Sequence, residues 1–112
     1  MTKLMITSTG EELDSLVEIR FGRAPYFIFC NAESGEQECV PNPGKDASGG
    51  AGVKAAQFLV DKGVEVLITG KVGPHAESAL KETGIKVYGA DSSMRVKEAL
   101  DNFSQGNLKQ IL

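Results

Sequence analysis

The chain has 112 residues, a hydrophobic content of 41% and a formal net charge of -3. This length suits one domain covering residues 1–112, and no apolar run approaches the ~20 residues of a membrane-spanning helix. The acidic balance argues against a nucleic-acid-binding protein, which needs a basic face to neutralise phosphates. The first residues are typical of a strand rather than of a signal peptide. We therefore expect a cytoplasmic domain that binds neither nucleic acid nor membrane.

The first part of the chain predicts strands joined by loops. Alternating apolar residues predict a first strand at Lys3–Thr7. Residues Glu11–Ile19 have a short helical spacing, and they suit either a helix or a loop with one turn. Aromatic and β-branched residues make Ala24–Asn31 the clearest strand, with Glu36–Val40 as its antiparallel partner.

The turn between these two strands decides where the two cysteines lie. Asn31 can bond the turn backbone and Gly35 can adopt a positive φ. A four-residue loop would put Cys30 and Cys39 diagonally on one face, a two-residue loop directly opposite each other, and a three-residue loop on opposite faces. Two thiolates on one face would be half of a zinc or iron–sulfur site, and ordinary buried cysteines are the alternative.

The second half predicts alternating helices and strands. The expected elements are a helix at Val53–Lys62, a strand at Val64–Thr69, a helix from Pro74 to Thr83, a strand at Ile85–Tyr88, a helix capped by Ser92 or Ser93, and a tail at Leu108–Leu112. This alternation implies right-handed parallel crossovers. Together with the hairpin it predicts an α/β domain with a mixed five-stranded sheet.

A glycine-rich segment at Gly49–Gly52 precedes the first helix of this half. Its backbone N–H groups suit an anion, although a flexible connection would have the same composition. The segment is not a P-loop, since no Gly-Lys-Ser/Thr follows it, and it is not a dinucleotide-binding fingerprint.

Three stretches, Arg20–Phe27, Gly49–Gln57 and Val66–Ala76, resemble the dinitrogenase iron–molybdenum cofactor biosynthesis family and keep its order over nearly the whole chain. The resemblance implies a ribonuclease-H-like, three-layer α/β/α fold. It also implies a stand-alone member similar to the nitrogenase accessory factors, which hold iron–sulfur or iron–molybdenum clusters and pass them on.

The candidate site lies where a strand meets a helix start. His75, the only histidine, follows such a strand, and ligands bind beyond the carboxyl ends of strands in open α/β sheets. Its imidazole could ligate iron or molybdenum, or it is an ordinary surface residue. Guanidinium groups clamp anions by fork-shaped hydrogen bonds. The residues expected to converge in one anion-binding cleft are Arg20, Arg23, Gly50, Gly52, Lys71 and His75.

No catalytic residues stand out. The strand centres carry Leu4, Ile6, Val66 and Ile68, so no inward carboxylates can form a two-metal nuclease site. We therefore expect no enzyme but a carrier of an iron–sulfur or iron–molybdenum cluster, held transiently. Its partners would be cluster donor or acceptor proteins, and the chain would be a monomer or weak homo-oligomer. A small regulatory or protein-interaction module and a binder of an anionic metabolite are the alternatives.

Overall fold

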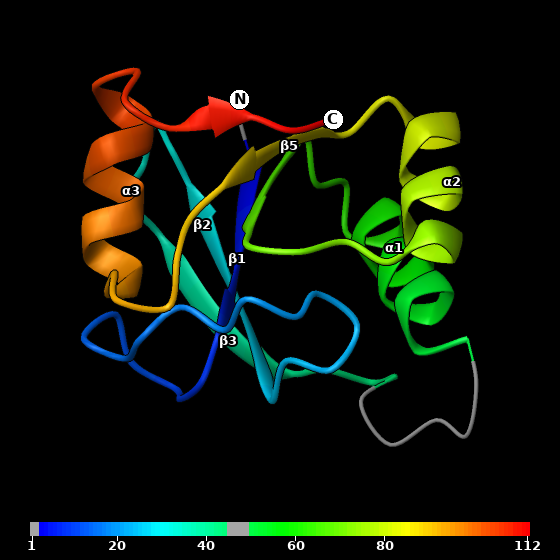
Figure 1. The fold of residues 1–112 in the computed structure, drawn as a ribbon. Helices are drawn as coiled ribbons and strands as arrows, with labels where there is room; N and C mark the ends of the chain where they lie inside the picture. The colour runs from blue at the N-terminus through cyan, green and yellow to red at the C-terminus, as the bar shows by residue number, and fades with distance from the viewer. Residues whose placement is uncertain (1–2, 45–49) are drawn as a thin grey trace.

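A computed structural model of the chain describes residues 3–44 and 50–112 (Figure 1). Gly49, which the sequence places in the glycine-rich segment, lies outside these residues. The elements are β1 (Lys3–Ser8), β2 (Tyr26–Asn31), β3 (Gln37–Pro41), α1 (Ala51–Asp61), β4 (Val66–Thr69), α2 (Pro74–Thr83), β5 (Lys86–Gly89), α3 (Val96–Ser104) and β6 (Lys109–Gln110). In the part of the chain that is described, no helix is long and apolar enough to cross a membrane.

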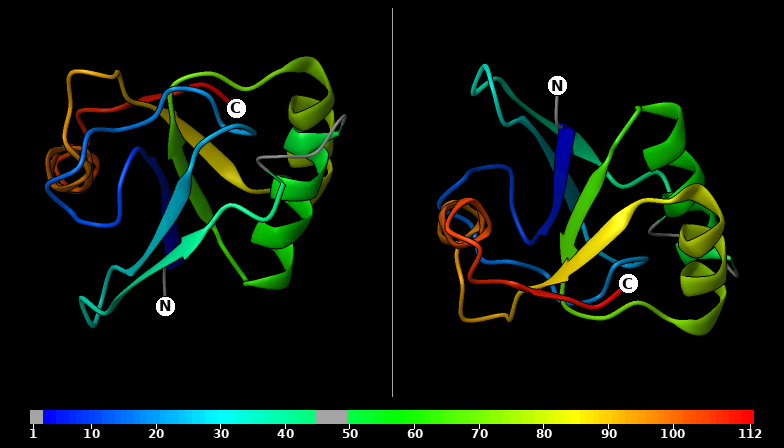
Figure 2. Two further views of the ribbon diagram at one scale, coloured as in Figure 1. Left: turned by 90° about the horizontal axis from the view of Figure 1, so that it is seen from below. Right: turned by 90° about the horizontal axis from the view of Figure 1, so that it is seen from above.

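All six strands belong to one mixed sheet, in the order β3-β2-β1-β4-β5-β6. The central strands β1, β4 and β5 are parallel, whereas β2, β3 and β6 each pair antiparallel with their neighbours. Figure 2 shows α1 and α2 on one face of the sheet and α3 on the other. The predicted mixed α/β architecture is thus confirmed.

The middle residues of the central strands β1 and β4 are apolar because both faces of these strands are covered. In β1, Met5 is fully buried against the α1 and α2 side, while Leu4 and Ile6 are buried on the α3 side. The four residues of β4 are likewise all buried. Such strands leave no polar side chain in the sheet centre, so the chemistry of the fold lies at the strand ends.

The β2–β3 hairpin has the four-residue loop that the sequence allowed. Asn31 pairs with Glu36 through its backbone, and its side-chain oxygen accepts hydrogen bonds from two turn N–H groups, each at 3.0 Å. Gly35 takes φ 75°, a value that favours glycine. In the resulting register Cys30 pairs with Gln37, and Cys39 with Ile28.

Two expectations were wrong, and one open alternative is settled. The sheet has six strands rather than five, because the expected tail forms β6 beside β5. Of the two alternatives for residues Glu11–Ile19, the loop is correct: they form turns and isolated bridges such as Ser8 with Val17. Neither Ser92 nor Ser93 caps α3, which begins at Val96.

The start of α3 uses a different side chain. The carboxylate of Glu98 accepts a hydrogen bond of 2.9 Å from the Arg95 N–H, and Ser93 instead bonds the side chain of Asp91. A residue of the first helical turn thus reaches back to its N-cap backbone, which is one half of a capping box.

Candidate functional site

One surface cavity of about 320 Å³ contains all six residues that the sequence predicted to converge. Those residues are Arg20, Arg23, Gly50, Gly52, Lys71 and His75. The cavity lies between the β1–β2 loop, the start of α1 and the loop from β4 into α2. The structure thus confirms that these residues share a cavity, while their role as ligands stays a prediction.

The β1–β2 loop reaches the cavity because it continues the pairing of β1 with β4. The Lys71 N–H donates to the Ile19 carbonyl at 2.5 Å, and the Phe21 N–H donates to the Lys71 carbonyl at 3.1 Å. Arg20 therefore forms a parallel bridge with Lys71. Two cationic residues, distant in the chain, are thereby neighbours in the lining of the cavity.

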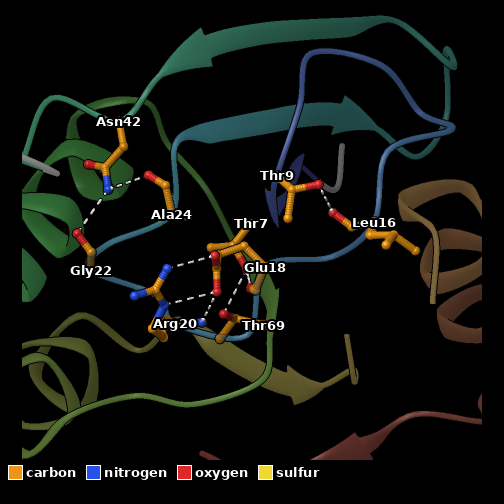
Figure 3. A network of polar contacts seen from close by, with 9 residues as sticks. All are labelled: Thr7, Thr9, Leu16, Glu18, Arg20, Gly22, Ala24, Asn42 and Thr69. Atoms are coloured by element: carbon orange, nitrogen blue, oxygen red, sulfur yellow. Dashed lines mark hydrogen bonds and ion pairs between the residues drawn. The ribbon is translucent and has the colours of Figure 1, made fainter. Parts of the chain in front are cut away.

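The buried hydroxyl groups of Thr7 and Thr69, at the ends of β1 and β4, also hold the β1–β2 loop in place (Figure 3). Thr7 donates to the carbonyl oxygen of Glu18 at 2.6 Å, and the hydroxyls of Thr7 and Thr69 lie 2.8 Å apart. Because Thr7 already donates to Glu18, Thr69 supplies the hydrogen between the two hydroxyls. The carboxyl ends of β1 and β4 are thereby tied to the residue two positions before Arg20.

Arg20 already has an acidic partner outside the cavity lining. The Glu18 carboxylate accepts from Arg20 Nη2 at 3.0 Å, from Nε at 3.2 Å and from the Arg20 backbone N–H at 3.0 Å. The hydrogen bond from Arg20 holds the pKa of Glu18 below its usual value. Because a guanidinium has five N–H donors, Arg20 keeps donors for a ligand while Glu18 fixes its orientation.

Two helix starts face the cavity without side-chain caps. The N-caps of α1 and α2 are Gly50 and Gly73, and neither makes a side-chain capping bond. The first-turn N–H groups of a helix have no partner within the helix, so they suit an anion when nothing caps them. Gly50 has φ 69°, which a side chain would strain.

The glycines also let three backbones meet at the floor of the cavity. A Cβ on Gly52 would lie 2.6 Å from the Cβ of Ala76, which joins α1 tightly to α2. A Cβ on Gly22 would lie 2.8 Å from the Gly52 backbone nitrogen. Side chains at these two positions would separate the loop and the two helix starts.

Asn42, which does not itself line the cavity, supports the cavity loop, and sequence reasoning missed it. Its side chain is buried, and its Nδ2 donates to the carbonyls of Gly22 and Ala24, both at 3.0 Å (Figure 3). Its Oδ1 accepts from the Gly44 N–H at 2.9 Å. Asn42 therefore fixes the cavity loop to the segment that follows β3. The sequence predicted only that β3 ends here.

The cysteines lie away from this cavity. Cys39 packs with the core on the α3 side of the sheet, and Cys30 follows the same alternation on β2, whereas α1 and α2 cover the opposite side. Neither cysteine lines the cavity that contains His75. Within residues 3–44 and 50–112, no three His, Cys, Asp or Glu side chains are grouped so as to hold a metal ion.

Both thiols are expected to alkylate slowly near neutral pH. Burial raises the pKa of Cys30, and burial followed by the Glu11 charge raises that of Cys39, so less of the reactive thiolate is present. We expect iodoacetamide to modify both more slowly in the native chain than in the urea-unfolded chain. Mass spectrometry of the two sites would check this, and equal rates in both states would contradict it.

Both the sequence and the fold of the chain are similar to those of known proteins. Residues 2–106 match the family model described as dinitrogenase iron-molybdenum cofactor. The chain belongs to this family. An uncharacterized protein of Methanocaldococcus jannaschii is 31% identical over 93 residues, which is 80% of this chain and 78% of that protein.

Two solved structures share the fold over nearly their full lengths. The apo form of the orange protein from Desulfovibrio gigas is 40% identical with a TM-score of 0.93, covering 98% of this chain and 92% of that one. A Thermotoga protein described as a candidate NifB protein of the DUF35 family is 46% identical with a TM-score of 0.87, covering 99% and 94%.

Proposed function

We propose that the chain is a non-catalytic carrier that holds an anionic iron–sulfur or iron–molybdenum-type cluster, or its precursor, in the 320 Å³ cavity. The observation that carries the proposal is the electrostatic character of that cavity. Arg20, Arg23 and Lys71 line it together with two uncapped helix starts, and none of its described lining residues is acidic. Positive side chains and oriented N–H groups favour a ligand of net negative charge.

The donor set favours transient over permanent binding. His75 is the single imidazole at the cavity, and the two cysteines lie elsewhere with raised pKa values. Stable iron–sulfur sites normally use four protein ligands, usually thiolates. A cluster that meets mainly charge and backbone N–H groups can be released to another protein, which suits a carrier.

The family assignment and the orange protein, solved in an apo form, support a cluster as the ligand. We further propose that the partners of the chain are cluster donor or acceptor proteins, that it is cytoplasmic, and that it is a monomer or weak homo-oligomer. The proposal also takes the fold to be ribonuclease-H-like, which agrees with the antiparallel β2 between β3 and β1 in the strand order.

The test is anaerobic titration with an iron–sulfur or iron–molybdenum cluster, followed by visible absorption and metal analysis. We expect stoichiometric binding that Arg20→Ala/Lys71→Ala weakens by about 100-fold or more, since two bonds to charged groups are lost and each contributes about 1.5–3 kcal/mol. His75→Ala tests its ligand role in the same assay. Cys30→Ser/Cys39→Ser is the matched control and should bind normally.

Each contrary outcome has a distinct meaning. Binding that survives Arg20→Ala/Lys71→Ala but fails in the cysteine variant would move the cluster to the hairpin. Absence of cluster binding, together with binding of phosphate or a carboxylate at this cavity, would favour the anionic-metabolite alternative.

A further inference from the structure

The sheet ends at β3, and the hydrogen-bonding pattern shows which backbone groups its edge presents. The Asn31 N–H bonds the Glu36 carbonyl, and the Asn42 N–H bonds the Pro25 carbonyl. Because antiparallel pairs alternate between bonded and non-bonded, residues 36, 38, 40 and 42 bond toward β2. The backbone groups of Gln37, Cys39 and Pro41 therefore point outward, where the described sheet has no further strand.

Glutamates flank this edge on both sides. Glu11 and Glu12, both exposed, line a groove of about 210 Å³ between β3 and the loop after β1, together with Cys39. A hydrogen bond to Glu11, followed by the Glu11 charge, raises the pKa of the neighbouring Tyr26, and burial followed by the same charge raises the pKa of Cys39 in the groove. The described lining contains no basic side chain.

On the opposite face of β3, Glu38 meets one cation. Lys62 Nζ lies 3.8 Å from the Glu38 carboxylate, and the two side chains are 36% and 60% exposed, so this ion pair is weak. Glu36 is exposed next to it. A strand added beside β3 would thus meet acidic side chains on both of its faces, accompanied by Lys3 and Lys62 on the second face and by no basic side chain in the groove.

We propose that the β3 edge docks an extended, basic segment of a partner protein, which adds a strand to the sheet and places a lysine or arginine in the groove beside Glu11 and Glu12. Outward backbone groups supply the affinity of such strand addition, and alternate side chains supply its specificity. A second copy fits poorly, because self-pairing would bring the glutamates of two β3 edges together and like charges opposite each other destabilise a sheet. This docking site is separate from the anion cavity, so it stands or falls independently of the proposed cluster.

The probe is an acetylated and amidated heptapeptide of alternating lysine and valine, titrated into the ¹⁵N-labelled chain. We expect amide shifts at Gln37 and Cys39, a Kd that rises with salt, and no binding by a peptide with glutamate in place of lysine. Methylating alternate peptide nitrogens should abolish binding, because it removes the donors that pair with β3.

Charge variants distinguish peptide binding in the groove from a general electrostatic attraction between a basic peptide and an acidic protein. Glu11→Gln/Glu12→Gln should weaken peptide binding about five-fold, in keeping with two exposed charge pairs. Glu65→Gln/Glu82→Gln removes the same charge from other exposed positions and should leave the Kd unchanged.

Three results would overturn the proposal. The first is the absence of amide shifts at Gln37 and Cys39 up to about 1 mM peptide. The second is an equal loss of peptide affinity in the two charge variants. The third is a dimer, detected by sedimentation, that pairs through β3 and thereby excludes the peptide. The last result would assign the edge to a second copy of the chain.

Discussion

Asn42→Ala is expected to lower the free energy of unfolding by about 3 kcal/mol and to weaken anion binding in the cavity. The substitution leaves the part-buried carbonyl of Gly22, the buried carbonyl of Ala24 and the buried N–H of Gly44 without their partner. Each buried group left without a hydrogen bond costs about 1–3 kcal/mol, and relaxation recovers part of that sum. Urea denaturation would measure the loss of stability.

Two further variants locate the cause. Asn42→Asp keeps an acceptor for Gly44 but loses both donors, so it should destabilise the chain and add a negative charge beside the cavity. Asn107→Ala removes an exposed asparagine whose side chain bonds only Gln105 at 3.1 Å, and its effect should stay below about 0.5 kcal/mol. A stable Asn42→Ala with unchanged binding would show that other contacts hold the loop.

Gly70→Ala is expected to destabilise the chain by about 3 kcal/mol through overpacking. A Cβ on Gly70 would lie 2.5 Å from the Cβ of Ile19 and 2.8 Å from its Cα, so the backbone itself must move. That movement would break the bond from Lys71 to the Ile19 carbonyl and separate Lys71 from Arg20. Thermal unfolding and anion affinity should therefore both fall.

Gly73→Ala is the matched control for this prediction. Gly73 lies on the same β4–α2 loop with φ -69°, and a Cβ there would meet no atom within 4 Å. Its cost should stay below about 1 kcal/mol, since only the preference for glycine over alanine at an N-cap is lost. Equal destabilisation by Gly70→Ala and Gly73→Ala would argue against steric conflict with Ile19.

The hairpin was the element that local sequence described best. Asn31 and Gly35 mark the turn by their own chemistry, but the sequence left loops of two, three and four residues open, and only the structure shows the register of Cys30 with Gln37. β6 could not be predicted, because its two residues are exposed and carry no alternation; only the neighbouring β5 makes them a strand. The loop after β1 likewise takes its shape from distant partners, such as Met94, whose carbonyl accepts from the Val17 N–H.

The cavity was predictable in outline for a related reason. Helix starts after strands are visible in the sequence, and parallel crossovers bring them to the same edge of a sheet. The role of Asn42 was not visible, because two of its three hydrogen bonds depend on a loop 18–20 residues away in the chain. The close contact of Gly52 with Ala76 was equally hidden, since it joins two helices that the sequence shows separately.

The contact of Gly52 with Ala76 has an electrostatic consequence. These residues lie within the first three positions of α1 and α2, so the two N-termini are neighbours. Each helix end carries a partial positive charge of roughly half a unit, and two like poles at such a distance repel. An anion in the cavity would screen one helix dipole from the other as well as binding both. An anion bound in the cavity should therefore tighten the packing of α1 against α2, and this packing should be looser when the cavity is empty.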